Sequence, residues 1–215
     1  MSSVAGTFYP TNGLICALDP NNIKSWPGTG TQLIDLTGNG YNVTVSGSGN
    51  FASYNGQTVL RIVAGSYLTV SNLSLGLPYT VLGVDRYNGL GGNNRGRTIS
   101  SNNINWLMNH WSNQRYPYYA GGWVGGLYTT EANNTWEIGI VTGTTGDYHC
   151  YYDGMDKTNA PTGGTTGPGI FQFSGITGAS EPSDCDIGLF LVWNRVLTDA
   201  EIATVYQDVR LRFGQ

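Results

Sequence analysis

The pattern of apolar and polar positions is short and broken along most of the chain, and it becomes continuous near the C-terminus. Residues 185–193 (CDIGLFLVW) are apolar at nearly every position. An apolar run of this length, rich in branched and aromatic residues, is typical of a strand that is covered on both faces. The sequence therefore predicts a fully buried strand over these residues.

An amphipathic helix is predicted directly after this strand, over residues 199–212. Thr198 and Glu201 have the spacing of a capping box, in which each side chain accepts a hydrogen bond from the backbone amide of the other residue. Gly214 can end the helix. One helical face is apolar, and it consists of Ile202, Val205, Tyr206, Val209 and Phe213. We expect this face to pack on the sheet, whereas Leu211 lies off it.

The preceding part of the chain is expected to form short strands separated by turns. Residues 58–62 and 67–70 are predicted to pair with each other, and residues 136–142 and 148–153 are predicted to form a hairpin. Helical segments do not alternate with these strands, which excludes a parallel sheet. We therefore expect an antiparallel sandwich or barrel.

The composition supports one all-β domain and limits its partners. The chain has 32 Gly, 14 Tyr and 6 Trp among 215 residues, with only 11% charged residues, which is typical of strands and tight turns. A net charge of −4 without a basic stripe argues against nucleic acid as a partner. No apolar run is long enough to span a membrane. We predict a single domain over residues 13–215 that follows an extended N-terminal arm, residues 1–12.

The three cysteines, Cys16, Cys150 and Cys185, each lie in an apolar or aromatic strand. Their number is odd, and their spacing fits no zinc motif. We expect three buried free thiols. A single disulfide among them is the alternative.

Four segments of the chain resemble the laminin-G-like branch of the concanavalin A-like lectin/glucanase superfamily. They are residues 13–20 with the turn at 35–40 (DLTGNG), the hairpin at 136–154, the strand at 170–173, and residues 187–202. The sharpest match is residues 194–202 (NRVLTDAEI). The resemblance implies a two-sheet antiparallel jelly-roll sandwich with one short C-terminal helix packed on it. It implies no single function, because the superfamily holds lectins, enzymes and purely structural modules.

The glutamates of the chain argue against catalysis. Glycoside hydrolysis requires two carboxylates about 5–10 Å apart, and enzymes of this superfamily carry them on one strand as E-x-D-x-x-E. The chain has four glutamates, and none lies in such a pattern: Glu131, Glu137, Glu181 and Glu201. Glu201 is in addition assigned to the helix cap. We therefore expect that the protein is not an enzyme.

A metal site is expected only through the resemblance. Laminin-G-like domains often bind calcium, and Asp35 and Asn39 are the matching candidate ligands. The alternative, which the sequence favours, is a turn in which the Asp35 carboxylate accepts backbone amides. We expect no other cofactor.

The middle of the chain is rich in rings that can bind sugars. The aromatic residues there are Trp106, Trp111, Tyr116, Tyr118, Tyr119, Trp123 and Tyr128. Carbohydrate binding requires an apolar ring face with polar groups at its edge. We expect Trp111, Tyr116 and Tyr118 to be exposed and to form this site with His110. The alternative, which the sequence favours, is that the rings fill the core or an oligomer interface, and that His110 is a hydrogen-bonded structural residue.

These expectations converge on a structural protein. Domains with this order of segments and a tryptophan-rich middle are most similar to structural proteins of bacterial viruses. We expect a non-enzymatic virion protein of a bacteriophage, namely a capsid decoration, fibre-tip or knob subunit. The first ten residues lack the features of a signal peptide, so assembly is expected in the host cytoplasm. The expected partners are other virion proteins or copies of itself, and a host-surface glycan. The alternative is a stand-alone lectin or carbohydrate-binding module.

Overall fold

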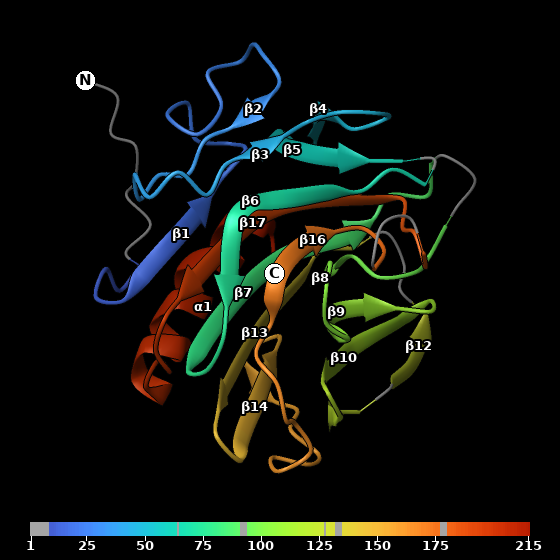
Figure 1. Cartoon of the computed structure of the whole chain (residues 1–215). Helices are drawn as coiled ribbons and strands as arrows, with labels where there is room; N and C mark the ends of the chain where they lie inside the picture. Colours follow the sequence, from blue (N-terminus) through green and yellow to red (C-terminus); the bar gives the residue numbers. More distant parts are fainter. Residues whose placement is uncertain (1–8, 64, 91–93, 127, 132–134, 177–179) are drawn as a thin grey trace.

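Two antiparallel sheets face each other, and one helix covers the outer side of one of them (Figure 1). This computed structural model describes residues 9–63, 65–90, 94–126, 128–131, 135–176 and 180–215. The expectation of an all-β antiparallel sandwich with one C-terminal helix is confirmed.

The first sheet has β7 and β17 near its centre, and both are buried at every position. Its strands, in spatial order, are β15 (Met155–Asp156), β14 (Asp147–Tyr152), β13 (Glu137–Thr144), β7 (Tyr79–Tyr87), β17 (Cys185–Trp193), β5 (Gln57–Ile62) and β4 (Asn50–Tyr54), and β1 (Leu14–Leu18) also pairs with β17. The predicted hairpin is confirmed, because β13 and β14 pair in unbroken register.

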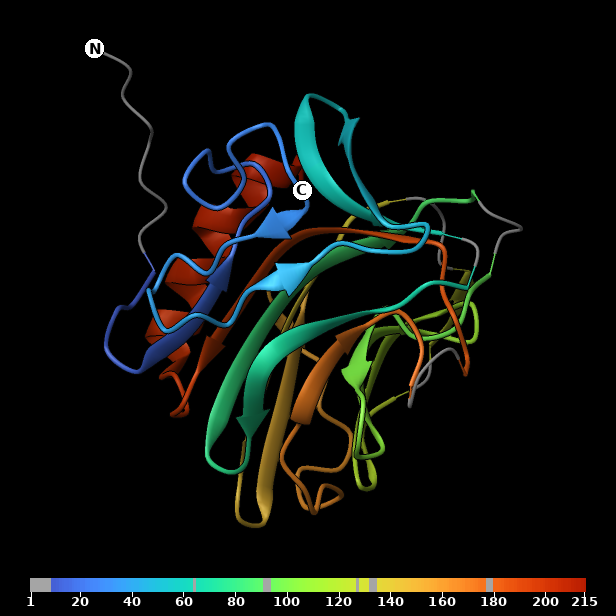
Figure 2. The ribbon, with the colours of Figure 1, turned by 45° about the horizontal axis from the view of Figure 1, so that its top comes forward.

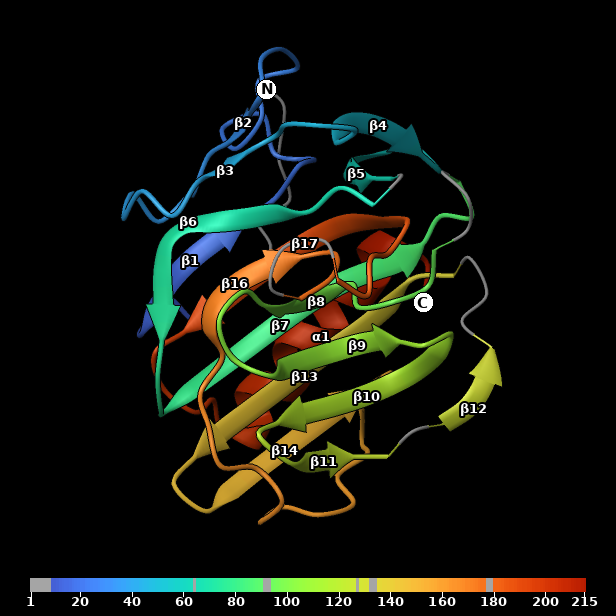
Figure 3. The ribbon, with the colours of Figure 1, turned by 45° about the vertical axis from the view of Figure 1, so that its right-hand side comes forward.

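The second sheet carries the aromatic middle of the chain at one end. Its strands, in spatial order, are β11 (Trp123–Gly125), β10 (Gln114–Ala120), β9 (Trp106–Trp111), β8 (Ile99–Ser101), β16 (Gly169–Phe173), β6 (Leu68–Leu75), β3 (Val43–Thr44) and β2 (Gln32–Leu33), and β12 (Tyr128–Glu131) also pairs with β10. Figure 3 shows β9, β10 and β11 side by side.

The expected pairing of residues 58–62 with 67–70 is wrong. The first segment belongs to β5, which pairs with β4 and β17, and the second belongs largely to β6 in the other sheet. Both segments direct apolar side chains into the same core, Leu60 and Ile62 from one sheet and Leu68 and Val70 from the other. Apolar alternation marks a core-facing strand but does not distinguish a hairpin from a crossing between sheets.

The strand over Cys185–Trp193 is covered on both faces, as predicted. Phe190 and Val192 point into the core between the sheets, where Phe190 makes edge contacts with Phe171 and Phe173 at centroid distances of 5.1 and 5.0 Å. Leu191 and Trp193 point to the opposite side and pack beneath the helix. The continuous apolar run therefore reflects one hydrophobic layer on each side of the strand.

The helix α1 (Asp199–Phe213) follows the sequence prediction closely. Both hydrogen bonds of the Thr198–Glu201 capping box are present, and Gly214 closes the helix at a φ of 70°. Its buried residues are Ile202, Val205, Val209 and Phe213, and they pack on the first sheet. Figure 2 shows α1 running along β1 and β17. No helix among the described residues is long and apolar enough to span a bilayer.

The described part of the expected N-terminal arm folds back on its own domain. The Tyr9 side chain packs against the cluster beneath α1. The indole nitrogen of Trp193 donates to the Pro10 carbonyl oxygen at 2.7 Å, and Arg195 donates to that of Asn12 at 2.8 Å. Residues 1–8 of the arm lie outside the described residues.

The cysteines follow the first of the two sequence expectations. Cys16, Cys150 and Cys185 are buried free thiols. Each packs in the core between the sheets, where burial raises the pKa of the Cys150 thiol to about 12. They are therefore inert packing residues at neutral pH.

Candidate functional site

The outer face of the second sheet carries an aromatic surface on β9, β10 and β11. Trp106, Tyr118 and Ala120 belong to the core between the sheets. Tyr119 lies between Tyr118 and Ala120 on β10, so the pleat of the strand directs its ring to the outside. Trp123 on β11 is in register with Tyr119 and faces the same way.

Three rings meet on this face, and we call them the tryptophan patch: Trp111, Tyr119 and Trp123. The centroids of Trp111 and Trp123 lie 5.5 Å apart with their planes tilted by 44°. Tyr119 meets Trp123 edge to face at 5.1 Å. Trp123 is 38% exposed, and the other two rings are partly exposed. The patch therefore offers apolar ring surface to solvent, held in place by ring–ring contacts.

Two glycines position Trp123 at the turn between β10 and β11. Gly121 has a φ of +76°, which L side chains rarely adopt. At Gly122 a Cβ atom would lie 2.0 Å from the carbonyl oxygen of Gly163. The backbone therefore approaches the loop at Gly163 more closely than any side chain would allow, and this contact fixes where β11 and Trp123 begin.

Polar groups border the patch at Trp111. The indole nitrogen of Trp111 donates to Oε2 of Glu181 at 3.2 Å. The Arg97 guanidinium also donates to Oε2 of Glu181, and its Nη1 donates to Oδ1 of Asn105 at 2.8 Å. The Glu181 side chain remains 39% exposed. Ring faces with carboxylate and amide groups beside them are the combination that sugar recognition requires.

The expectation that Tyr118 is exposed is wrong. Tyr118 is fully buried, and its hydroxyl bonds with that of Tyr79 at 2.5 Å and donates to the Thr142 carbonyl oxygen at 3.0 Å. The strand pleat that turns Tyr119 outward turns Tyr118 inward. It therefore presents no ring face to a ligand in this structure.

Tyr116 is partly exposed, but its polar end is used within the domain. Its hydroxyl donates to Oδ2 of Asp153, and its ring packs on Tyr152 with centroids 5.1 Å apart. The Arg115 guanidinium lies 4.7 Å from the ring centroid. Among the expected sugar-binding residues, the structure thus places only Trp111 in the tryptophan patch, and Tyr119 and Trp123 join it there.

His110 lies fully buried between the sheets. Its Nδ1 lies 3.1 Å from Oδ1 of Asp85, and its Nε2 lies 3.4 Å from Oε2 of Glu137. Arg115 donates to the same Glu137 oxygen at 3.0 Å. We call these four residues the inter-sheet cluster, with both carboxylates from the first sheet and both cations from the second. His110 is therefore a buried structural residue with polar partners, as the alternative expectation stated. It is not placed to contact a sugar.

Burial and the close contact of opposite charges both raise pKa values in this cluster. It raises the pKa of Glu137 to about 7, with His110 and Arg115 opposing the shift and Asp85 adding to it. Burial by itself would lower the pKa of His110, but Glu137 and Asp85 outweigh that effect and raise it. Protons are therefore held in the cluster near neutral pH.

The sequence reasoning missed a pair of carboxylates. Asp85 on β7 and Glu137 on β13 lie directly opposite each other in register, and residues so placed have Cβ atoms about 5 Å apart. A search for acidic residues along one strand cannot find a pair that is formed across two strands. Both side chains are fully buried, however, so this pair cannot contact a substrate in the present structure. The side chain of Glu131 lies outside the described part of the chain.

The expected calcium ligands take part in a turn. The buried Asp35 carboxylate accepts from the amides of Ala17 at 2.9 Å and Thr37 at 3.0 Å. Asn39 donates its amide to the Ile15 carbonyl oxygen at 2.8 Å. This is the backbone-capping alternative, and calcium binding stays an untested prediction. Among the described residues, no group of three or more His, Cys, Asp or Glu side chains could hold a metal ion.

Many solved structures resemble this fold, including the three that follow. A Trypanosoma rangeli sialidase in complex with the inhibitor DANA is 15% identical, with a TM-score of 0.64 over 96% of this chain and 34% of that chain. The binding domain of Paraclostridial Mosquitocidal Protein 1 is 12% identical, with a TM-score of 0.65 over 92% and 52%. Domain 4 of AbnA, a GH43 extracellular arabinanase from Geobacillus stearothermophilus in complex with arabinotriose, is 17% identical, with a TM-score of 0.65 over 90% and 98%.

These similarities differ in how much of each protein they cover. The chain spans about a third of the sialidase and about half of the mosquitocidal binding domain, but nearly all of the arabinanase domain. No protein-family model and no curated protein matches the chain. At these identities the likeness shows that the chain shares a β-sandwich fold with domains of these proteins.

Proposed function

We propose that this protein is a non-enzymatic carbohydrate-binding domain that stacks sugar rings on the tryptophan patch. The observation that carries the proposal is the contact of Trp111 and Trp123 on the outer face of the second sheet, at 5.5 Å and partly open to solvent. The structural neighbours support the same ligand class, since they include sialidases and an arabinanase domain bound to arabinotriose.

The proposal includes no catalysis, and burial supports this. The carboxylate pair of Asp85 and Glu137 lies between the sheets with no exposed surface. The carboxylate that borders the patch, Glu181, is occupied by Arg97 and Trp111. A hydrolase would need two carboxylates that both reach the scissile bond, and among the described side chains only that of Glu181 borders the tryptophan patch.

Binding to oligosaccharides with and without the patch tests the proposal. The wild type is screened on a glycan array, and the best ligand, or arabinotriose as a first probe, is titrated by calorimetry. Trp111→Ala and Trp123→Ala should each weaken binding about tenfold or more, because a lost stacking contact of about 1.4 kcal/mol corresponds to a factor of ten. Trp123→Phe, which keeps a ring, should retain part of the affinity.

The control variant is Leu211→Ala on α1. Leu211 is 74% exposed and lies outside the patch, so its removal should leave affinity unchanged. All variants should still unfold in one cooperative transition, which circular dichroism checks, although the tryptophan variants lose ring–ring packing and Trp111→Ala also loses the hydrogen bond to Glu181. Unchanged affinity in both tryptophan variants would rule out the patch as the sugar-binding surface.

We further propose that the domain acts as a structural subunit of a bacteriophage virion, in contact with other virion proteins or with copies of itself. The order of the four resembling segments, together with the tryptophan-rich middle at residues 105–111, supports this role. A sugar-binding patch would serve such a subunit by holding a host-surface glycan. The alternative is a stand-alone lectin, with the same ligand class but no particle.

Density-gradient purification of virus particles separates the two roles. A virion subunit should remain with the particles after repeated banding and should be detected there by mass spectrometry. A stand-alone lectin should stay in the soluble fraction while keeping its glycan affinity, and that result would contradict the virion role without affecting the proposal for the patch.

A further inference from the structure

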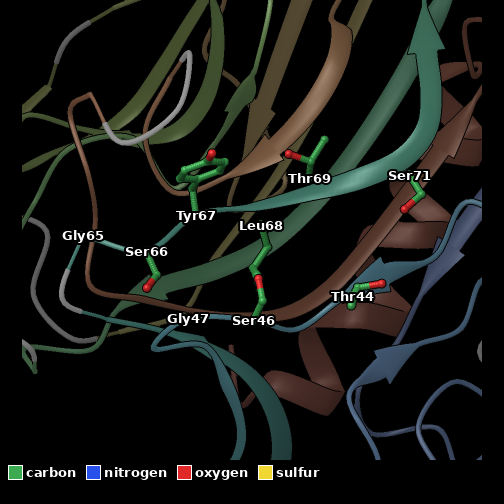
Figure 4. A pocket seen from close by; sticks show the side chains of 9 residues that line it. All are labelled: Thr44, Ser46, Gly47, Gly65, Ser66, Tyr67, Leu68, Thr69 and Ser71. Carbon is green, nitrogen blue, oxygen red and sulfur yellow. The ribbon is translucent and has the colours of Figure 1, made fainter.

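A depression lined by hydroxyl groups opens at the end of the second sheet opposite to β11. It has a volume of about 400 Å³. Figure 4 shows its lining side chains, which come from β3 and the loop after it on one side, and from β6 and the residues before it on the other. Those that carry a hydroxyl are Thr44, Ser46, Ser66, Tyr67, Thr69 and Ser71.

A second depression adjoins the first and shares Ser46 and Gly47 with it. Its volume is about 480 Å³. Trp26 and Phe51 line it as a stacked pair, with centroids 4.4 Å apart and planes within 20° of parallel. We call the two joined depressions the hydroxyl groove. The Trp26–Phe51 pair lines one depression, and Tyr67, a residue that is 43% exposed, lines the other.

The backbone fixes the shared part of the hydroxyl groove. The Ser48 amide donates to Oγ of Ser66 at 2.9 Å, which ties the loop after β3 to the residues before β6. Gly47 has a φ of +63°, and a Cβ there would lie 3.0 Å from the same Ser66 oxygen. This close approach and the pairing of Val43 with Val70 connect the two walls of the first depression.

The lining of the hydroxyl groove is neutral. Among the described residues that line either depression, none is Asp, Glu, Lys, Arg or His. Hydroxyl groups both donate and accept, as sugar hydroxyls do, so each can serve the other in either direction. A charged ligand would lose hydration here without gaining a partner of opposite charge. The lining therefore favours an uncharged, hydroxyl-rich ligand with apolar faces.

We propose that the hydroxyl groove is a second binding site, and that it takes an uncharged oligosaccharide. Sugar faces would lie on Tyr67 at one end and on the Trp26–Phe51 pair at the other, with the serine and threonine hydroxyls between them. The ligand class is that of the proposed function, but the groove shares no residue with the tryptophan patch, so either site can fail without the other.

A consequence for polymers follows from the placement of the two sites. The tryptophan patch lies on β9 to β11, and the hydroxyl groove lies on β3 and β6 at the other end of the same sheet. A long polysaccharide that reaches both binds the second site at a high effective concentration. A longer chain offers more binding frames than a trisaccharide does, which raises its apparent affinity in proportion to the number of repeats. Binding at both sites at once should raise the affinity beyond that proportion.

The test uses the full chain carrying Trp123→Ala, so that binding at the tryptophan patch is weakened. Backbone amide signals are followed by nuclear magnetic resonance during titration with arabinotriose, xylotriose and maltotriose, and with trigalacturonic acid as the charged arm. We expect an uncharged trisaccharide to shift the signals of residues 44–51 and 65–71 with saturation, and the anionic one to bind at least threefold more weakly.

Variants of the hydroxyl groove complete the test. Tyr67→Ala should reduce the affinity about tenfold by removing a ring face, and Thr69→Val should reduce it several-fold by removing a lining hydroxyl while keeping the shape of the side chain. Tyr67→Phe should retain binding, and Leu211→Ala serves as the control outside both sites. The proposal is overturned if no uncharged trisaccharide shifts these signals at tens of millimolar, or if Tyr67→Ala and Thr69→Val leave the shifts unchanged. If the wild type binds no glycan at the tryptophan patch but does bind one at the hydroxyl groove, the proposed role of the patch is contradicted and the proposal for the groove still stands.

Discussion

At the scale of single residues, the protonation of the inter-sheet cluster should affect the free energy of unfolding. Asp85, His110, Glu137 and Arg115 face one another across the sheets, and Arg115 also lies 3.4 Å from the Asp153 carboxylate. Buried ion pairs add little net stability compared with apolar residues of similar size, but removing one partner is costly. The cluster therefore acts as a polar clamp between the sheets, and its protonation should control how tightly it holds.

Stability should fall as pH rises from about 5 to 8. The pKa of Glu137 is raised from 4.5 to about 7, and that of His110 is raised as well. The folded state then binds more protons than the unfolded state in this window, so the free energy of unfolding decreases with pH. The melting temperature of the wild type should decline across the window, and that of Glu137→Gln, which cannot release this proton, should decline less.

The acid side provides an internal control for this prediction. The Arg195 guanidinium and the Thr198 amide lower the pKa of Glu201 to about 2, so its contribution is lost only below about pH 4.5. A wild-type melting temperature that is constant between pH 5 and 8, or a slope that Glu137→Gln leaves unchanged, would contradict the role given to the cluster.

At the scale of elements, α1 is part of the hydrophobic structure and not an appended tail. Its buried face packs on β13, β17 and neighbouring strands, with Trp136 meeting Phe213 edge to face at 5.0 Å. Arg212 near its end forms an ion pair with Asp19, which follows β1. The helix thus covers the side of β17 that would otherwise expose an apolar strand face.

Two substitutions separate the cap of α1 from its packing. Thr198→Ala removes the capping hydroxyl and should lower the free energy of unfolding by about 1 kcal/mol. Ile202→Ala leaves a cavity beneath the helix and should lower it by about 2–5 kcal/mol. Chemical denaturation measures both values. A loss for Ile202→Ala no larger than that for Thr198→Ala would show that the helix is not packed as described.

At the scale of the whole molecule, we predict that the chain associates with copies of itself or with a larger assembly, since the sequence offers the aromatic middle of the chain as an oligomer interface. The described end of the N-terminal arm is held within the domain, because the Trp193 indole nitrogen donates to the Pro10 carbonyl oxygen. The exposed aromatic rings of the tryptophan patch are also of the kind enriched at protein interfaces. The same surface therefore fits either sugar binding or assembly.

If the chain self-associates, light scattering should give a mass at least twice that of one chain, which is 23.1 kDa. A variant that begins at Gly13 should lose stability, because the buried Trp193 indole nitrogen then lacks its acceptor, at a cost of about 1–3 kcal/mol. If the tryptophan patch is an oligomer interface, Trp123→Ala should lower the mass measured by light scattering. If the patch binds only sugar, Trp123→Ala should leave that mass unchanged. A monodisperse monomer at high concentration that also binds no virus particles would count decisively against assembly.

The sequence by itself determined those features that depend on near neighbours in the chain. The strand at Cys185–Trp193, the capping box at Thr198 and the hairpin of β13 with β14 all appear where local spacing placed them. Hydrophobic period, cap spacing and turn chemistry act over a few residues, so they can be recognised without knowing the fold. The resemblance added the two-sheet order.

Only the tertiary structure decided which side chains meet. Asp85 faces Glu137 because β7 and β13, which are distant in the sequence, became neighbours in a sheet. Trp111 and Trp123 share a surface because the register of β9, β10 and β11 turns both rings to the same face. Strand order and register fix such pairs, and a shift of one residue reverses the face of every side chain, as the opposite fates of Tyr118 and Tyr119 illustrate. Neither strand order nor register can be obtained by counting the aromatic or acidic residues along the chain.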